Sequence, residues 1–419
     1  MAVNAESAQT EADSALLCLR TFQIIDEISE RSKDSIIGIG ERLSCKIVAA
    51  ALRDKGVDSE LVSFEHIVQA SLARNDGDDG DDQAEDEIEP GEEFNLGQDF
   101  YDRVARKMGE RLRECGSRVP VVTGYFGVVP GSLLKQVGRG YTDLCAALCA
   151  VGLEAAELQI WKEVDGIFSA DPRKVPTARL IPIITPDEAA ELTYYGSEVI
   201  HPFTMEQVIR AAIPIRIKNV ENPNGGGTVI YPQSDTPLVA QDGTASEQAA
   251  ALSAYQRPVK RFPEHLPTAV TIKDEIVIIN IHSNRKTLSH GFLAKIFGTL
   301  DRFGVIVDLI STSEVHVSMA IHATLVRKEI DKMVKELKKI GTVTVLRDMV
   351  ILSLVGRLQN MVGISGRMFT TLAEGHINIE MISQGASEIN ISCVIEGKDA
   401  IKALNLVHRS CLSIPPAAI

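Results

Sequence analysis

The C-terminal part of the chain contains one structural pattern twice. Val277–Ile321 and Val350–Ile395 each read as a strand, a helix, an alternating strand, a turn and a second alternating strand, with another helix after each copy. Equivalent positions lie 72 residues apart, as in Phe297 and Phe369 and in Ile310 and Ile382. An internal repeat of this kind indicates a duplicated supersecondary unit. The pattern therefore predicts two small βαββαβ units, over residues 267–346 and 347–415.

The sequence GRGYTDLCAAL, in the first half of the chain, holds a candidate anion site. Gly138 and Gly140 flank Arg139, so the backbone can approach an anion beside a guanidinium group. We expect Thr142 to cap the following helix and Asp143 to lie in its first turn. The N–H groups at such a helix start favour a phosphate or a carboxylate. A plain glycine turn is the competing interpretation, and the residue types alone do not decide between the two.

A charged loop follows that helix and a short strand. Glu157–Trp161 is predicted to be a buried strand, and the loop after it runs from Lys162 and Glu163 through Gly166 to the Asp-Pro-Arg tripeptide at Asp171. Loops at the carboxyl ends of strands are where open α/β sheets bind ligands. We therefore expect this loop to form the second part of the candidate site.

Apolar spacing predicts the other elements of the first 232 residues. Expected helices cover Ala15–Arg31, Asp99–Cys115, the stretch from the capping residue Thr185 to Tyr195, and Phe203–Ala212, and expected strands cover Val57–Ser63, Val119–Thr123, Ile213–Lys218 and Thr228–Tyr231. Asp34–Gly56 is predicted to be a glycine loop that enters a helix. His201 precedes a proline, and we expect a buried hydrogen-bonding residue there rather than an acid or base.

Charge and hydropathy argue against several classes of partner. Asp76–Glu93 carries eleven acids and no base, so most of the net charge of −14 is local, and the mildly acidic remainder argues against nucleic-acid binding. The surrounding segment, Asn75–Glu93, is predicted to be a disordered insertion rather than a calcium loop. No apolar run is long enough to span a bilayer and the first residues lack a basic signal, so we predict no membrane partner and a cytoplasmic location.

The seven cysteines are an odd number without a C-x-x-C motif, which indicates a reducing compartment and predicts no metal site. Cys145 and Cys149 lie four residues apart and can share one face of a helix. A role as small apolar core residues is favoured over a metal or redox role.

Three stretches of the sequence together resemble a known family. GRGYTDLCAAL, WKEVDGIFSADPRKVP and ELTYYGSEVIHP resemble the aspartate kinases of the amino-acid kinase family, the fungal type most closely, and the resemblance extends from about Ser35 to Val407. The duplicated units resemble paired ACT domains. The resemblance implies an α/β protein: a tail and helix over 1–34, a three-layer α/β/α amino-acid kinase domain over 35–232, a linker over 233–266, and two ferredoxin-like βαββαβ ACT domains.

The resemblance also implies a reaction and its site. The family transfers the γ-phosphoryl group of ATP to the side-chain carboxylate of L-aspartate, usually with Mg²⁺ bridging the phosphates, as the first step towards threonine, methionine and homoserine. By resemblance, the substrate-binding residues are Glu41, Arg139, Thr142 and Asp143, with Arg139 and Asp143 as catalytic candidates. The nucleotide-binding candidates are Gly138, Gly140, Lys162, Glu163, Phe168, Asp171 and Arg173. On residue chemistry alone, Glu41 reads as an acid that complements a helix dipole.

The ACT resemblance implies feedback regulation by an amino acid, and threonine is expected because the match is nearest to the fungal type. Candidate effector-binding residues are Ser289, Phe292, Asp308, Ser313, Glu314, Gln384 and Asn390. Without the resemblance, Ser311–Glu314 reads as a solvated β-turn. Assembly into a homo-oligomer through the ACT domains is also implied.

One family motif does not occur in the sequence. Family members open with a strand and loop of the form Lys-Phe-Gly-Gly-Thr-Ser, whose lysine contacts the transferred phosphoryl group. We therefore expect an N-terminally incomplete kinase domain with poor turnover. Three functions stay open: an aspartate kinase, a catalytically impaired homologue that acts as an amino-acid-binding regulatory protein, and a kinase of another small amino-acid carboxylate.

Overall fold

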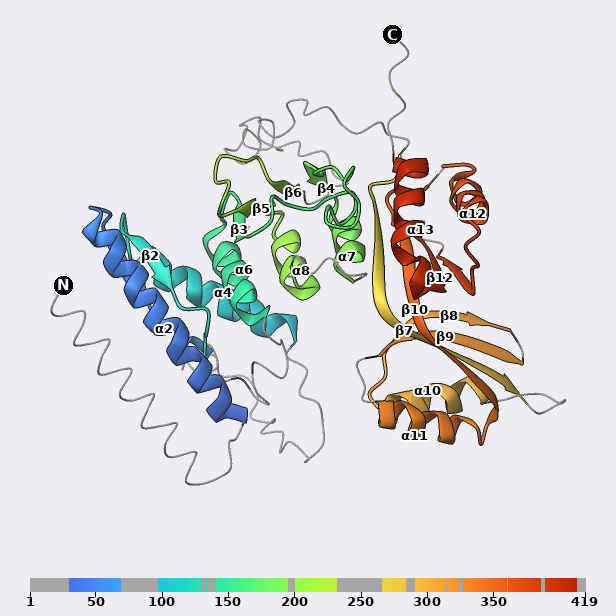
Figure 1. Cartoon of the computed structure of the whole chain (residues 1–419). Helices are drawn as coiled ribbons and strands as arrows, with labels where there is room; N and C mark the ends of the chain where they lie inside the picture. The colour runs from blue at the N-terminus through green and yellow to red at the C-terminus, as the bar shows by residue number, and fades with distance from the viewer. Residues whose placement is uncertain are drawn as a thin grey trace, which may run out of the picture. The chain divides into compact units, whose positions relative to one another are not determined.

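The structure, a computed structural model, describes residues 30–68, 97–127, 129, 133, 140–194, 200–231, 266–283, 291–313, 315–323, 327–359, 361–385 and 389–412 (Figure 1). The chain divides into two compact units. Unit 1 comprises Met1–Ile160, Ile200–Arg216 and Tyr231–Ala251, and unit 2 comprises Trp161–Val199, Ile217–Ile230 and Leu252–Ile419. The predicted acidic insertion, the linker up to residue 265 and the helix predicted over Ala15–Arg31, up to residue 29, lie outside the described residues.

Unit 1 is built from four helices around a small parallel sheet in its described part. The helices are α2 (Glu30–Asp54), α4 (Gln98–Arg113), α6 (Tyr141–Leu153) and α8 (Pro202–Arg210), and β1 (Ser59–Val62) pairs with β2 (Val119–Val122). The spacing that predicted α4 is confirmed, because Phe100, Val104, Met108 and Leu112 are all buried. Cys145 and Cys149 on α6 belong to the same apolar core, as favoured from the sequence.

The prediction that Asp34–Gly56 begins with a glycine loop before its helix is wrong. Residues 34–40 are helical, and α2 runs without a break through Gly38 and Gly40. Gly38 packs against the ring of Tyr125, where a Cβ atom would lie 2.8 Å from Tyr125 Cδ1. This glycine therefore permits a close approach inside a helix rather than a turn.

The middle of the chain contributes a four-stranded sheet. Its strand order is β3 (Leu158–Lys162), β5 (Ile215–Asn219), β6 (Thr228–Ile230) and β4 (Ile183–Ile184), and β4 and β6 are parallel. The strand expected at Glu157–Trp161 exists, but it is not buried throughout, since Trp161 is 41% exposed. Helix α7 (Pro186–Tyr194) begins as predicted, with Thr185 and Glu188 exchanging hydrogen bonds at its start.

The duplicated region of unit 2 forms one six-stranded sheet in the order β11-β12-β10-β7-β9-β8 (Figure 1). Its strands are β7 (Ala269–Ser283), β8 (Val307–Thr312), β9 (His316–His322), β10 (Gly341–Val355), β11 (Met381–Gln384) and β12 (Asn390–Glu396). Its helices are α10 (Phe292–Arg302), α11 (Arg327–Leu337), α12 (Ile364–Glu374) and α13 (Ala400–Val407); the short 3₁₀ turn η2 (Gly397–Asp399) precedes α13 and the π-helical turn η3 (His408–Leu412) follows it. The α/β class and the duplicated unit predicted from the sequence are confirmed.

The two repeats share their central strands rather than forming separate sheets. The late half of β7 contributes Ile279 to one core, while its early half contributes Val270 to the other. Both central strands change conformation near their midpoints, at Glu275 (φ 59°) and Asp348 (φ 57°). The domain boundary predicted between residues 346 and 347 falls within β10 and stays a prediction. Among the described residues, no helix is long and apolar enough to cross a membrane.

Candidate functional site

Three segments of unit 1 converge on the carboxylate of Glu41, which projects from α2. The backbone N–H of Tyr125 donates to Oε2 at 2.7 Å, and the hydroxyl groups of Tyr141 and Thr142 donate to Oε1 at 2.7 and 2.9 Å. Three donors fix the orientation of this carboxylate. The oriented carboxylate can therefore bind a cation, such as an ammonium group.

Local backbone packing explains why this site forms. A Cβ atom at Gly124 would lie 2.6 Å from Thr142 Cγ2 and 2.9 Å from Glu41 Oε2, so only glycine fits between them. The prediction that Thr142 caps α6 is wrong, because Gly140 occupies the N-cap position without a side-chain cap. Thr142 lies inside the first turn, and its hydroxyl is directed to Glu41 instead.

Two neighbouring groups stay protonated beside this carboxylate. Burial raises the pKa of Tyr141 well above its usual value, and the hydrogen bond to Glu41 raises it further. Burial and then the charge of Glu41 also raise the pKa of Cys45, whose thiol donates to Val122 O at 3.2 Å. Both groups act here as donors, and neither is activated as a nucleophile.

The other predicted substrate residues are only partly described. Asp143 lies in the first turn of α6, as expected, and Gly140 approaches His201, where an added Cβ would be 3.2 Å from His201 Cβ. Gly138 and Arg139 lie outside the described residues. His201 caps α8 by accepting from Phe203 N at 3.3 Å, so the structural role holds, but the expected burial is wrong because its side chain is exposed.

The predicted nucleotide residues of unit 2 fall into two places. Lys162 ends β3, and Glu163 follows it on the surface. Phe168 lines a small cavity of about 200 Å³ together with Asp165, Leu180, Asn219, Asn222 and Gly225–Gly227. Asp165 Oδ1 accepts from Asn219 Nδ2 at 3.1 Å and from Asn222 Nδ2 at 3.3 Å. Sequence reasoning missed the two asparagines, although their position at the carboxyl end of β5 and in the turn after it was the available signal.

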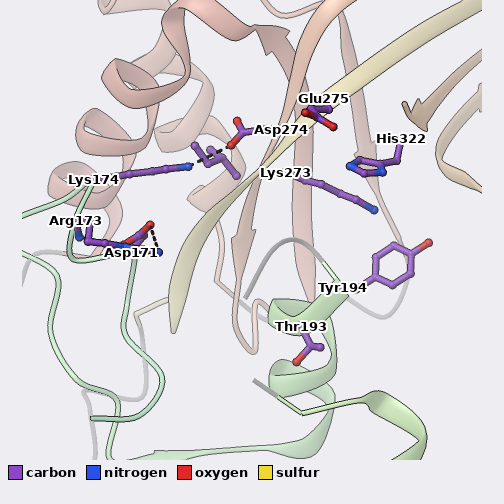
Figure 2. Close-up of a pocket in the computed structure, with 10 residues that line it drawn as sticks. Asp171, Arg173, Lys174, Thr193, Tyr194, Lys273, Asp274, Glu275 and His322 are labelled. Atoms are coloured by element: carbon purple, nitrogen blue, oxygen red, sulfur yellow. Dashed lines mark hydrogen bonds and ion pairs between the residues drawn. The ribbon is translucent and has the colours of Figure 1, made fainter. Parts of the chain in front are cut away.

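Asp171 and Arg173 line a larger cavity of about 800 Å³ (Figure 2). Its other walls are formed by Lys174, Thr193, Tyr194, Ile272, Lys273, Asp274, Glu275 and His322. Asp171 Oδ1 accepts from Arg173 N at 3.0 Å and from Arg173 Nε at 3.1 Å. Burial opposes the charge of Asp171, but these hydrogen bonds outweigh it and lower the pKa of the carboxyl.

The candidate effector residues have partners that the sequence did not reveal. The side chain of Asp308 is 3% exposed, and its Oδ1 forms an ion pair with Lys273 Nζ at 2.6 Å. Lys273 lies 4.7 Å from the ring centre of Tyr194, at the end of α7. Burial raises the pKa of Tyr194, and the nearby charge of Asp308 raises it further. Asp308 therefore belongs to a polar cluster that joins β7, β8 and α7.

The other effector candidates are spread over unit 2. Asn390 Nδ2 donates to Glu191 of α7, and Gln384 Oε1 accepts from Ser365 Oγ at 3.1 Å. Phe292 is buried at the start of α10, and Ser313 N donates to His316 O at 2.8 Å in a turn between strands. Ser289 and Glu314 lie outside the described residues. These positions do not form a single contact cluster within their described members.

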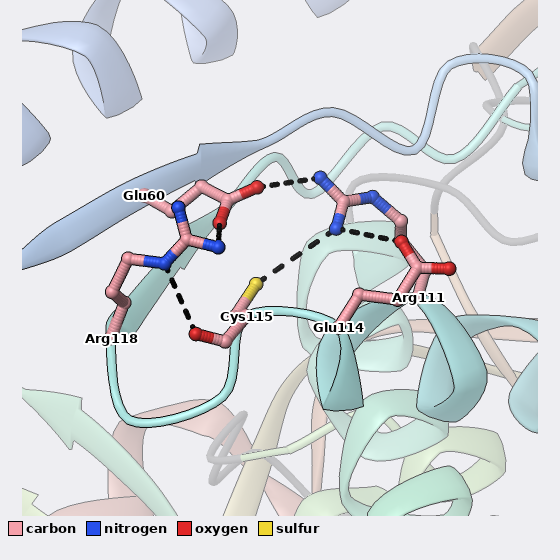
Figure 3. Close-up of polar contacts among 5 residues, drawn as sticks. All are labelled: Glu60, Arg111, Glu114, Cys115 and Arg118. Carbon is pink, nitrogen blue, oxygen red and sulfur yellow. Dashed lines mark hydrogen bonds and ion pairs between the residues drawn. The ribbon is translucent and has the colours of Figure 1, made fainter.

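A second polar cluster lies in unit 1 (Figure 3). Glu60 of β1 accepts from Arg111 at 2.7 Å and forms an ion pair with Arg118, also at 2.7 Å. Arg111 also contacts Glu114, and Arg118 Nε donates to Cys115 O at 3.1 Å. The two arginines neutralise the two glutamates, so this cluster connects β1 to α4 and has no net charge that would attract a ligand. Across the described ranges, no three His, Cys, Asp or Glu side chains are grouped as metal ligands.

Comparisons with known proteins agree with this architecture. Residues 4–219 match the amino acid kinase family, and residues 352–410 match an ACT domain. The chain is 53% identical over 403 residues to the aspartokinase of Schizosaccharomyces pombe, covering 94% of this chain and 72% of that protein. Two solved structures of Escherichia coli aspartokinase III, one with aspartate and ADP and one with lysine and aspartate, align with TM-scores of 0.69 and 0.70. Both are 24% identical and cover 98% of this chain and 82% of theirs, so they support the fold.

Proposed function

This chain belongs to the aspartokinase family, and from that membership we propose that it transfers the γ-phosphoryl group of ATP to the side-chain carboxylate of L-aspartate. The observation that carries the proposal is the fixed carboxylate of Glu41 beside the start of α6. Its donors hold the carboxylate in one orientation, which suits the α-ammonium group of an amino acid.

The substrate would be held at both of its charged ends. Glu41 would bind the α-ammonium group and Arg139 the α-carboxylate, while Thr142 and Asp143 shape the pocket. The start of α6 has no side-chain cap, so its N–H groups favour a negatively charged group there. The reactive side-chain carboxylate of aspartate is then oriented by contacts at the other end of the molecule.

Nucleotide contacts are assigned to two stretches of the sequence, the glycines around Arg139 and the loop after β3. We assign Gly138, Gly140, Lys162, Glu163, Phe168, Asp171 and Arg173 to nucleotide contacts, with the cation of Arg173 near the phosphates. Magnesium bound with ATP would neutralise phosphate charge. The protein's part is to position two anions and to stabilise the charge that develops between them.

Regulation by threonine through the ACT units is part of the proposal, as is a place at the start of threonine, methionine and homoserine synthesis. An ACT match supports binding of a small effector. Calorimetry on the whole chain should show binding of threonine in preference to lysine and methionine, weakened by Ser313→Ala. Binding of lysine but not threonine would contradict this assignment.

A homo-oligomer is also proposed, because apolar side chains lie exposed at both edges of the six-stranded sheet. Ile306, directly before β8, is 75% exposed, and Ile310 on β8 is 38% exposed. Ile382 on β11 is 49% exposed. Exposed apolar edge strands favour association between chains. Light scattering coupled to gel filtration would measure the mass, and a monomer at micromolar concentration would contradict the proposal.

The test of the main proposal is trapping of aspartyl phosphate as its hydroxamate. Glu41→Gln keeps the side-chain size and removes its charge. We expect KM for aspartate to rise about 100-fold, because loss of one member of a buried charge pair costs roughly 2 to 5 kcal/mol. Glu110→Gln, on the exposed side of α4, is the matched control and should behave like the wild type.

The outcomes also separate the alternatives. No hydroxamate from the wild-type chain, together with threonine binding, would favour the regulatory-protein alternative. Hydroxamate from another small carboxylate but not from aspartate would favour the third candidate. An unchanged KM in Glu41→Gln would remove the substrate role assigned to Glu41.

A further inference from the structure

The loop that carries Asp171 and Arg173 is closed by hydrogen bonds across its two ends. Ser169 N donates to Arg179 O at 2.8 Å, and Arg179 N donates back to Ser169 Oγ at 2.9 Å. Phe168 and Leu180 extend the closure as an antiparallel bridge. Residues 169–179 therefore form a self-contained loop, named here the nucleotide loop.

A buried histidine joins the two ends of the nucleotide loop. His408, in the π-helical turn η3, is 4% exposed, and its Nε2 lies 2.9 Å from Ser169 Oγ. Its Nδ1 lies 3.4 Å from Thr177 Oγ1. Because Ser169 Oγ already accepts from Arg179 N, its own hydrogen can donate to Nε2. This assignment gives a neutral imidazole that carries its proton on Nδ1 and donates it to Thr177.

The C-terminal helices also hold the nucleotide loop by apolar packing. Ala170 and Val175 are buried in the same core as Val407 and Leu412. Asn405 Nδ2 donates to Lys174 O at 3.0 Å. The position of this loop is therefore set by residues that lie more than 200 positions later in the sequence.

We infer that His408 is a positioning residue for the nucleotide: by bridging Ser169 and Thr177, it fixes the loop from which Asp171 and Arg173 reach the phosphates. The inference rests on the proposed nucleotide role of those two residues. It assigns no chemical step to His408, which acts through the loop and does not touch the reacting groups.

The environment of His408 favours the neutral imidazole. Burial, followed by the charge of Arg179, lowers the pKa of His408 below its usual value. Arg179 belongs to the nucleotide loop itself. A second cation, Arg367 of α12, lies near Cys411 in the same turn as His408 and partly offsets the effect of burial, which raises the pKa of the Cys411 thiol. Protonation of His408 reverses its hydrogen bond with Ser169 and places a buried positive charge near Arg179, so we expect the bridge to weaken as the pH falls.

The first experiment measures KM for ATP with the whole chain in the hydroxamate assay. His408→Asn removes the contact to Ser169, and we expect KM for ATP to rise about 5- to 10-fold with kcat changed less than twofold. His408→Gln supplies a carbonyl oxygen near Nε2 and should restore most of the affinity. His376→Asn is the control, because His376 is exposed in the same unit and has a φ of 53°, which Asn tolerates.

The pH profile distinguishes positioning from a general loss of stability. KM for ATP of the wild type should rise as the pH falls through the lowered pKa of His408, which burial keeps below its usual value. The His408→Gln profile should stay flat over the same range. Equal acid profiles in both proteins, or an unchanged KM in His408→Asn, would overturn the inference.

A second measurement does not depend on enzyme activity. Trypsin can cut after Arg173 or Lys174, and mass spectrometry can follow those two cuts on the folded chain. Cleavage there should be about 10-fold faster in His408→Asn than in the wild type, but not in His408→Gln or His376→Asn. If the wild type forms no hydroxamate, the proposed function fails. If hydroxamate forms but neither KM nor cleavage changes, only the role of His408 fails.

Discussion

Two glycine-to-alanine substitutions in unit 1 should have opposite effects on stability. Gly109 lies where α4 crosses α6, and a Cβ atom there would lie 2.1 Å from the backbone oxygen of Gly152. A Cβ atom at Gly152 would meet Ala105 O at 2.0 Å, so the contact is tight from both helices. Gly40 is also helical, but nothing lies within 4 Å of the position of its Cβ.

The expected magnitudes follow from these distances. Ordinary carbon–oxygen contacts are about 3.3 Å or more, so alanine at 109 requires the helices to separate by about 1 Å. Overpacking of this kind costs about 1 to 3 kcal/mol, and the two backbones cannot move aside as a flexible side chain can. Alanine also gains about 1 kcal/mol of helix propensity over glycine. Gly109→Ala should therefore destabilise by up to about 2 kcal/mol, whereas Gly40→Ala should stabilise by up to about 1 kcal/mol.

Thermal unfolding followed by circular dichroism would test this pair. The two variants should have melting temperatures on opposite sides of the wild type, separated by about 4 to 10 °C for a unit of this size. Urea unfolding would check that the free energy of unfolding, and not only the midpoint, has changed. A Gly109→Ala protein as stable as Gly40→Ala would refute the helix contact on which the reasoning depends.

Two further predictions concern titratable groups. The hydrogen bond from Arg111 and the charge of Arg118 lower the pKa of Glu60, although the partial loss of solvation around its carboxylate acts in the opposite direction. The ion pairs therefore stabilise the folded state at pH values above the usual pKa of a glutamate, and this stability is lost as the pH falls through the lowered pKa. Glu60→Gln should make the free energy of unfolding, measured by urea titration, less dependent on acid pH. An unchanged pH dependence in this variant would contradict the prediction. Burial raises the pKa of Cys393 to about 12, so a thiol reagent should modify it only after denaturation, and rapid labelling of Cys393 in the native protein would show that β12 is not enclosed.

Much of the fold could be predicted from local sequence pattern. The apolar spacing of Phe100, Val104, Met108 and Leu112 defined α4, and the 72-residue repeat identified the duplicated unit. The kinase motifs identified the family, because such motifs combine residue types in a fixed order. Periodicity reports which face of an element is buried, and this information is contained within the element itself.

Most of the site geometry could not be predicted in that way. The donors to Glu41 come from Tyr125, Tyr141 and Thr142, between 84 and 101 positions away in the sequence. The same limit applies to Gly38. The sequence favoured a glycine loop there, whereas the structure places this residue inside α2 and against the ring of Tyr125. Local propensity describes what a residue can adopt, but not which distant group will occupy the space beside it.

The sequence by itself determined the family, the repeated unit and the types of residue available for binding. Only the tertiary structure decided that β7 and β10 serve both repeats and that Val175 of the nucleotide loop is buried in the C-terminal core. It also placed His408 between Ser169 and Thr177. The physical reason is that burial and hydrogen bonding are satisfied by whichever group lies nearest in space, and chain folding brings together groups whose separation in sequence carries no periodic signal.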